Sequence, residues 1–159
     1  MLVNTESVAA TRALARAVAS VVKGGDVVVL AGDMGAGKTA FTQGLASALG
    51  VTGPVTSPTF TLVRSYPATG GLTLHHLDIY RLDRLGEVAD LALEELIDRR
   101  SVTVIEWGDV IGDVLPTDRL DIAFSFGNDP DEREIELDCA GPSWRSREQQ
   151  LIDAVGAVG

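Results

Sequence analysis

Cysteine is almost absent from the sequence. Its only cysteine is Cys139, so no disulfide can form within the chain and no cluster of cysteines can hold a zinc ion. A single thiol of this kind usually serves as a small apolar side chain, and we expect Cys139 to be buried or half-buried in the core. The lack of a disulfide framework suits a reducing compartment, which predicts a cytoplasmic location.

Long apolar runs are also missing. No stretch reaches the roughly 20 unbroken apolar residues that a bilayer-spanning helix requires. The N-terminus lacks the basic and apolar regions of a secretory signal, so we expect neither export nor contact with a membrane. Apolar residues nevertheless make up 45% of the 159 residues, which is enough for one folded domain over residues 1–159 with a single core.

Basic residues are fewer than acidic ones, and the excess of acidic residues is confined to one part of the chain. Lysine and arginine number 13 against 23 acidic residues, a formal charge of −10. Residues 83–138 hold five basic and seventeen acidic residues, whereas residues 1–82 hold six and four and residues 139–159 hold two of each. An acidic half argues against a direct, non-specific grip on nucleic acid, which needs a basic surface. It fits either a basic protein partner or a solvated acidic face.

Strands and helices alternate along the chain, without internal repeats. Leu14, Val18 and Val22 recur every four residues, which predicts a first helix. Helices are expected over about 7–22, 38–49, 84–99 (one or two short ones) and 143–155, buried strands over 27–31 and 102–106, and hairpins over 60–66 with 72–78 and 119–126 with 132–138. This order favours an α/β sandwich whose sheet is mixed because of the two hairpins.

Three glycines stand in the segment "GDMGAGKT", residues 32–39, directly behind the apolar run 27–31. Glycines adopt positive φ and let backbone N–H groups converge on an anion, and the helix that begins near Lys38 adds the positive end of its dipole. In this pattern Lys38 is expected to supply a charge for the β- and γ-phosphates, and the hydroxyl of Thr39 can ligate Mg²⁺. The pattern therefore predicts a loop that binds ATP or ADP with Mg²⁺. The residues expected to contact the nucleotide are Gly32, Met34, Gly35, Ala36, Gly37, Lys38, Thr39 and Ala40.

Two acidic residues end apolar strands in the same sequence. A phosphate loop needs an acidic partner for Mg²⁺ at the end of a neighbouring buried strand. Glu106 ends the run "VTVI" and Asp78 ends "LTLHHL". We expect one of them to bind Mg²⁺ together with Thr39 and the other to orient the attacking water. Which acid has which role stays open, with Glu106 the first choice for the metal.

Four segments together carry a resemblance to a known family. The segments "GDMGAGKTAF", "SPTFTLV" (57–63), "HHLDIYRL" (75–82) and "IEWGD" (105–109) resemble the TsaE (YjeE) family, the bacterial ATPases of tRNA threonylcarbamoyladenosine synthesis. The phosphate loop is shared by many families, whereas the other three segments in this order are far more specific. The resemblance runs from about Val27 to Phe126, which is most of the chain.

The resemblance implies a single-domain P-loop NTPase fold, a three-layer sandwich with a mixed, mostly parallel central sheet plus hairpins. It also implies two protein partners, TsaB and TsaD, of which TsaD transfers a threonylcarbamoyl group to the adenosine beside the anticodon. The ATPase would cycle this complex rather than transfer the group, with slow hydrolysis alone and stimulation by its partners. Contact with tRNA would then be indirect or weak.

The resemblance also extends to single residues. The catalytic residues implied are Lys38, Asp78, Glu106 and Thr59, the last in a switch loop that senses the γ-phosphate. His76 matches the family's histidine, although a histidine at such a position is by itself more often structural than catalytic. Trp107 either stacks near the nucleotide or belongs to the core.

Two other functions are compatible with a phosphate loop in a chain of this size. A small-molecule kinase must bind an acceptor and usually closes an arginine-bearing lid over the phosphates. Arg99 and Arg100 form the only adjacent arginine pair, and acidic residues surround it. A nucleotide-binding regulatory module without turnover would not need the intact set of Lys38, Thr39, Asp78 and Glu106.

Overall fold

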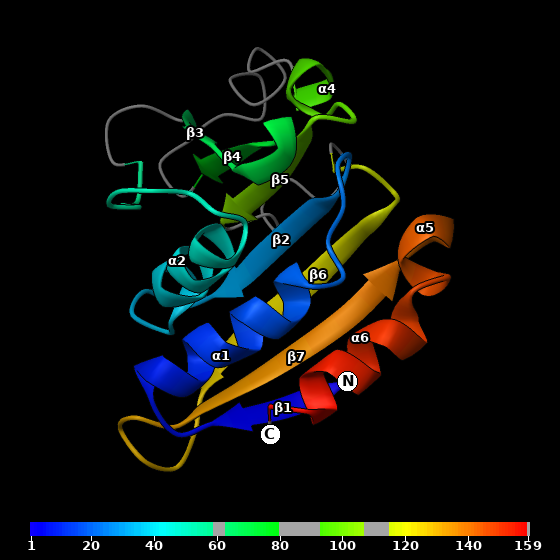
Figure 1. Cartoon of the computed structure of the whole chain (residues 1–159). Coiled ribbons are helices and arrows are strands. Elements are labelled where there is room, and N and C mark those ends of the chain that lie inside the picture. Colours follow the sequence, from blue (N-terminus) through cyan, green and yellow to red (C-terminus); the bar gives the residue numbers. More distant parts are fainter. Residues whose placement is uncertain (59–62, 80–92, 107–114, 159) are drawn as a thin grey trace.

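A computed structural model describes residues 1–58, 63–79, 93–106 and 115–158. Its strands form one seven-stranded sheet in the order β1-β7-β6-β2-β5-β4-β3 (Figure 1). The strands are β1 Leu2–Thr5, β2 Val27–Gly32, β3 Val63–Pro67, β4 Thr73–Asp78, β5 Ser101–Glu106, β6 Arg119–Phe126 and β7 Arg133–Ala140. The helices are α1 Val8–Ala19, α2 Lys38–Ala48, α4 Leu93–Leu96, α5 Gly141–Arg145 and α6 Glu148–Gly156, with a short 3₁₀ turn, η1, at Thr69–Gly71. Within the described ranges no helix has the length and apolarity to cross a membrane.

The sheet is parallel in its centre and antiparallel at both margins. Strands β6, β2, β5 and β4 pair in parallel, while β3 pairs antiparallel with β4 and β7 pairs antiparallel with β6 and β1. This arrangement confirms the α/β fold with a mixed sheet and both predicted hairpins. The predicted strand residues 60–62 and most of the helical segment 84–99 lie outside the described residues.

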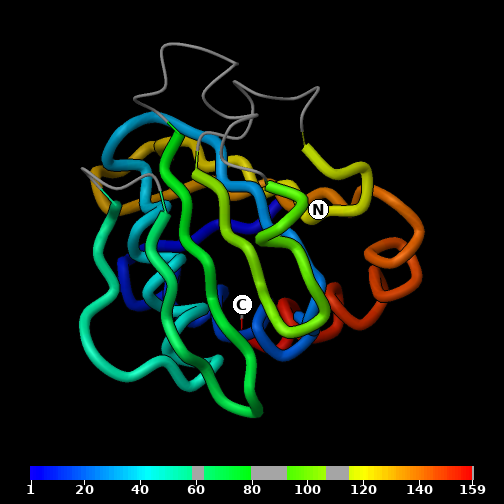
Figure 2. The backbone as a smooth tube through the Cα atoms, turned by 90° about the horizontal axis from the view of Figure 1, so that it is seen from above, coloured from blue at the N-terminus to red at the C-terminus, as the bar shows by residue number. Residues whose placement is uncertain are grey.

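Helices cover both faces of the sheet because its central strands are apolar on both sides. Along β2, Val28 and Leu30 belong to the larger hydrophobic cluster, which includes apolar side chains of α1, α2 and α6. Val27 and Val29 belong to the smaller cluster on the opposite face, together with Leu93 of α4. Figures 1 and 2 show α1, α2 and α6 on the same side of the sheet. The three-layer sandwich is thereby confirmed.

Two details of the fold differ from the sequence-based expectation. The first strand, β1, was not predicted, because four residues are too few to display an alternation, and its partner β7 is more than a hundred residues away. The helix predicted over 143–155 is two helices, α5 and α6. The chain bends at Arg147, whose φ of −112° and ψ of 5° are not helical.

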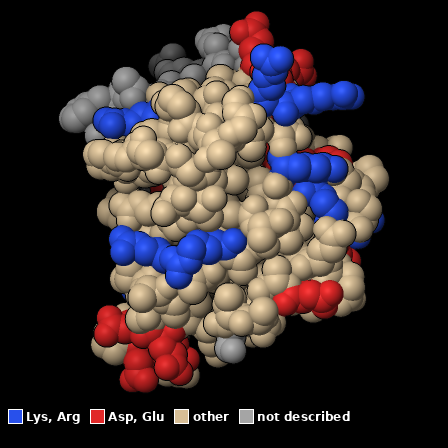
Figure 3. All heavy atoms as spheres, viewed as in Figure 1, with Lys and Arg blue, Asp and Glu red and all other residues tan. Residues whose placement is uncertain are grey.

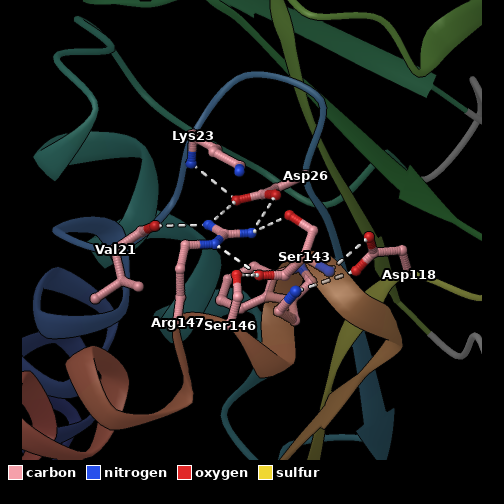
Figure 4. Close-up of polar contacts among 8 residues, drawn as sticks. Val21, Lys23, Asp26, Asp118, Ser143, Ser146 and Arg147 are labelled. Carbon is pink, nitrogen blue, oxygen red and sulfur yellow. Dashed lines mark hydrogen bonds and ion pairs between the residues drawn. The ribbon is translucent and has the colours of Figure 1, made fainter.

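A buried ion pair accounts for the bend between α5 and α6. The guanidinium of Arg147 donates to both carboxylate oxygens of Asp26 at 2.8 Å and to the carbonyl of Val21 at 2.8 Å (Figure 4). Its carbon centre lies 4.3 Å above the ring of Trp144. Asp26 also accepts the backbone N–H of Lys23 at 2.8 Å. This ion pair thus attaches the C-terminal helices to the turn that leads into β2.

Cys139 is buried on β7, as expected. Burial raises the pKa of its thiol, and the negative charges of Glu148 and Asp138 act in the same direction. The thiolate, which is the reactive form, is therefore disfavoured, and Cys139 has the packing role predicted for it.

Helices α1 and α2 approach each other closely at Gly44. A Cβ atom at this position would lie 2.8 Å from the carbonyl oxygen of Arg12 and 2.9 Å from the Cβ of Ala15. In Gly44→Ala we expect overpacking, which costs about 1–3 kcal/mol, to outweigh the roughly 1 kcal/mol that alanine gains in helix propensity. Urea denaturation should show a net loss of about 1 kcal/mol in the free energy of unfolding.

Gly156 provides the matched control for this prediction. It also lies in a helix, but a Cβ there meets no atom within 4 Å. Gly156→Ala should leave the free energy of unfolding unchanged or raise it slightly. Equal stability of the two variants would contradict a close contact at Gly44.

Candidate functional site

The loop between β2 and α2 requires glycine at its two ends. At Gly32 the backbone has φ of 134°, and a Cβ atom would lie 2.4 Å from the carbonyl oxygen of Phe124. Gly37 caps the start of α2 with φ of 111°. Side-chain-bearing residues rarely adopt such angles, so the glycines of the sequence motif are required by the turn itself. The loop therefore takes the strand–turn–helix form predicted for it.

Lys38 lies beneath this loop rather than on the surface, with 5% of the residue exposed. Its Nζ atom donates to the carbonyl oxygens of Gly32 and Asp33, the latter at 2.9 Å. Because Lys38 is also the first residue of α2, its charge adds to the positive end of the helix dipole. The arrangement concentrates positive potential where an anion would enter the loop.

The loop borders a cavity of about 510 Å³, the size of a small-molecule site. Of the predicted nucleotide-contacting residues, six line this cavity: Met34, Gly35, Gly37, Lys38, Thr39 and Ala40. Gly32 and Ala36 do not line it. Ala36 is fully buried in the larger hydrophobic cluster, and its N–H donates to the carbonyl of Asp33 at 3.1 Å. Thr59, the predicted switch residue, and Trp107 lie outside the described residues.

The two predicted acids meet at the same cavity. Asp78 and Glu106 are paired in register at the carboxyl ends of the parallel strands β4 and β5, and both line the cavity. The Oγ of Ser57 donates to Asp78 Oδ2 at 3.0 Å. Glu106 is 3% exposed and lies 2.8 Å from the Nε2 of His76. The sheet therefore brings together the loop and both acids, as is usual at the carboxyl edge of an α/β sheet.

Side-chain alternation explains why these acids face the loop. On β4, Leu74 packs in the cluster on the α2 side, so His76 and Asp78, at two-residue intervals, point to the same side. On β5, Val104 packs in that cluster and Glu106 follows at the same interval. The intervening His75 points to the other face, where Ser65 Oγ lies 2.8 Å from its Nδ1. Burial lowers the pKa of His75, partly offset by the charge of Asp98.

The cavity also has a wall that the sequence did not reveal. Ser7, Val8 and Thr11 come from the start of α1, Asp131 comes from the turn between β6 and β7, and Arg133 is the first residue of β7. Acidic side chains gather over this turn (Figure 3), and Arg133 is the one basic residue among the acids of residues 129–138. This isolated arginine in an acidic segment was the feature of the sequence from which a role for Arg133 could have been predicted.

Arg133 is held against the phosphate loop. Its NH2 atom donates to the carbonyl of Gly35 at 3.4 Å, and its NH1 atom donates to the carbonyls of Pro130 and Glu132, both at 2.7 Å. Its guanidinium lies 4.8 Å above the ring of Phe126. A second positive charge therefore stands at the cavity, beside the phosphate loop.

The donor set of the cavity is of the kind that Mg²⁺ prefers. Among the described residues no group of three or more histidine, cysteine or acidic side chains could hold a metal ion unaided. Thr39, Asp78 and Glu106 instead offer a hydroxyl and two carboxylates at one cavity. Mg²⁺ is usually held by one or two carboxylates together with substrate phosphates, so these residues fit the predicted ion.

The strand–loop–helix unit around Lys38, set in a sheet with acids on the adjacent strands, defines a P-loop protein. Within that class the similarity is specific, because residues 5–135 match the model of the threonylcarbamoyl adenosine biosynthesis protein TsaE. The chain belongs to the TsaE family.

Similar proteins agree over most of the chain. A Bacillus subtilis protein named tRNA threonylcarbamoyladenosine biosynthesis protein TsaE is 44% identical over 131 residues, covering 82% of this chain and 80% of the relative. A protein of the same name from Streptomyces coelicolor is 40% identical over 146 residues, covering 89% of this chain and 98% of the relative. The crystal structure of Bacillus subtilis YdiB superposes with a TM-score of 0.82 at 36% identity, covering 96% of this chain and 94% of that one.

Proposed function

We propose that the chain is the ATPase of tRNA threonylcarbamoyladenosine synthesis, which binds ATP with Mg²⁺ and cycles a TsaB–TsaD complex in the cytoplasm rather than transferring the group itself. The observation that carries the proposal is the meeting of Lys38, Asp78 and Glu106 at one cavity. The pathway follows from membership of the TsaE family. The partners follow from the sequence motifs shared with that family.

Lys38 and Arg133, which both line the cavity, would hold the triphosphate at the loop by their charges. Both cations are held by backbone carbonyls, so they are positioned before the nucleotide arrives. Preorganised charges of this kind stabilise the charge on the transferred phosphoryl group without reorganisation during the reaction. Thr39 and one of the two acids would hold Mg²⁺, which neutralises the charge of the phosphates when bound.

The environments of the two acids suggest different roles. Glu106 is buried and paired with a buried histidine, which suits a metal ligand whose orientation must be fixed. Asp78 is less buried, and its partner Ser57 precedes the predicted switch residue Thr59 by two positions. We assign the metal to Glu106 and the orientation of the attacking water to Asp78. In this scheme Ser57 links the position of the switch loop to Asp78.

Partner proteins should stimulate hydrolysis by the isolated chain. The segment 50–58, which is rich in glycine and proline, contains Ser57 and leads to Thr59, and an order imposed on it by a partner would complete the site. Titrating TsaB and TsaD into the chain should raise phosphate release at least severalfold until the complex saturates. Unchanged release across the titration would mean that the partners do not complete the site.

Reconstitution tests the proposed function as a whole. With TsaB, TsaD, tRNA and threonylcarbamoyl-adenylate, modification should continue beyond a single turnover only when this chain and ATP are both present. Multiple turnover without the chain would contradict the proposed function. A phosphate transferred from ATP to a small-molecule acceptor, in place of released phosphate, would instead indicate a kinase.

A further inference from the structure

A buried histidine contacts one of the two acids of the site. His76 is fully buried, and its Nε2 lies 2.8 Å from Glu106 Oε1, whose side chain is 4% exposed. An ionised carboxylate only accepts hydrogen bonds, so Nε2 is the donor. Its other ring nitrogen, Nδ1, is buried without a hydrogen-bond partner in the part of the chain that the structure describes.

The position of His76 is unfavourable for a residue kept only for packing. It continues the apolar row of Leu74 on β4, and its register partner on β5 is the buried Val104. A buried polar atom without a partner destabilises a core, whereas an aliphatic side chain in the same place would leave none. The ring is therefore best explained by the one polar contact it makes, which is the contact with Glu106.

Glu106 needs such a partner because of its neighbour. It is paired in register with Asp78, and neighbouring strands lie only about 4.8 Å apart. Two carboxylates this close repel each other, and a glutamate has enough rotatable bonds to turn away. A donor fixed in the core removes that freedom by binding Oε1. Among the described residues no hydrogen bond engages the second oxygen, Oε2, and the residue itself lines the cavity.

We infer that His76 is a positioning residue, which holds Glu106 through one Nε2–H···Oε1 hydrogen bond so that the carboxylate faces the nucleotide cavity in a single orientation. The inference rests on the proposed function, in which Glu106 binds Mg²⁺. Such an outer partner raises metal affinity by fixing the ligand, without itself touching the metal or the nucleotide.

The amide of glutamine tests the role of the hydrogen bond, because its nitrogen extends about as far from the backbone as Nε2 of histidine. Leucine fills a similar space without a donor. Binding of ADP should be measured for His76→Gln and His76→Leu, in Mg²⁺ and in EDTA, and the ratio of the two dissociation constants gives the Mg²⁺ enhancement. We expect the enhancement to fall at least fivefold in His76→Leu and to stay within about twofold of the wild type in His76→Gln.

The adjacent histidine provides a matched control. His75 lies on the same strand but faces the other side of the sheet, where it contacts Ser65. His75→Leu should keep the Mg²⁺ enhancement of the wild type. Thermal unfolding identifies variants that fail to fold, and if His76→Leu is among them, His76→Asn replaces it, because its shorter amide cannot reach Glu106.

The outcomes separate this inference from the function on which it rests. An unchanged enhancement in folded His76→Leu, or an equal loss in His76→Gln, would overturn the positioning role while leaving the Mg²⁺ site in place. Absence of any Mg²⁺ enhancement in the wild type would overturn both.

The hydrogen bond itself can be observed without nucleotide. The sequence contains two histidines, so nitrogen NMR of a histidine-labelled chain gives only two rings to assign. We expect His76 to carry its proton on Nε2 and its ring signals to shift in Glu106→Ala, while those of His75 remain in place. A His76 spectrum that is insensitive to Glu106→Ala would show that the contact is not formed in solution.

Discussion

Lys38→Ala is expected to lower Mg²⁺-dependent ATP hydrolysis about a hundredfold. Removing the ammonium deprives the phosphates of a buried point charge at the start of α2, and two charge-assisted contacts at about 1.5 kcal/mol each amount to roughly two powers of ten in rate. Steady-state phosphate release, with and without partner proteins, measures the loss. Circular dichroism should show that the variant is folded.

Two further variants test whether the loss of hydrolysis is due to the charge of Lys38. Lys38→Met keeps the apolar stem that fills the space beneath the loop, so a loss equal to that of the alanine variant assigns the effect to the charge. Lys23 is the other lysine of the chain and is exposed, so Lys23→Ala should hydrolyse ATP at the wild-type rate. A folded Lys38→Met protein with normal hydrolysis would show that the loop does not act as a phosphate site.

The phosphate loop was predictable because its signal is local. Strand, glycines and helix follow one another within 27–49, and each residue type has a conformational reason to stand where it does. The fold class was predictable for a related reason, since apolar runs and hairpin turns specify elements over short distances. By contrast, the bend at Arg147 depends on Asp26, which is 121 positions away. Without knowledge of that partner, a continuous helix is the natural expectation.

In the candidate site, too, contacts between residues far apart in the sequence could not be predicted. Asp78 and Glu106 were identified from the ends of their strands, but nothing in the sequence states that β4 and β5 pair in a register that sets the two acids side by side. Arg133 was missed because its relevance depends on the start of β7 lying against the phosphate loop, to whose Gly35 it donates across 98 positions. Local sequence patterns thus identify single functional residues, whereas the sheet topology decides which of them lie next to one another at the site.

Asp78→Asn and Glu106→Gln should both lose at least tenfold in hydrolysis, but for different reasons. Each change keeps the shape of the side chain and removes a charge at the carboxyl ends of paired strands. If Glu106 binds the metal, Glu106→Gln should weaken ADP binding in Mg²⁺ and leave binding in EDTA unchanged. Asp78→Asn should bind normally and lose turnover, because a water-orienting group acts only in the transition state.

Paired measurements on each variant decide between the two assignments. Nucleotide affinity in Mg²⁺ and in EDTA reports on the metal, and the rate at saturating ATP reports on the reaction. The reverse pattern, with weakened Mg²⁺-dependent binding in Asp78→Asn alone, would exchange the two roles. Full turnover in both variants would remove both acids from the mechanism.

A further variant tests the link between the switch loop and Asp78. Ser57→Ala removes the 3.0 Å hydrogen bond to Asp78, and it should lower turnover severalfold without weakening nucleotide binding. Because Ser57 lies in the segment that partners are proposed to order, stimulation by those partners should fall in the same variant, and unaltered stimulation would place the partner's effect elsewhere in the site.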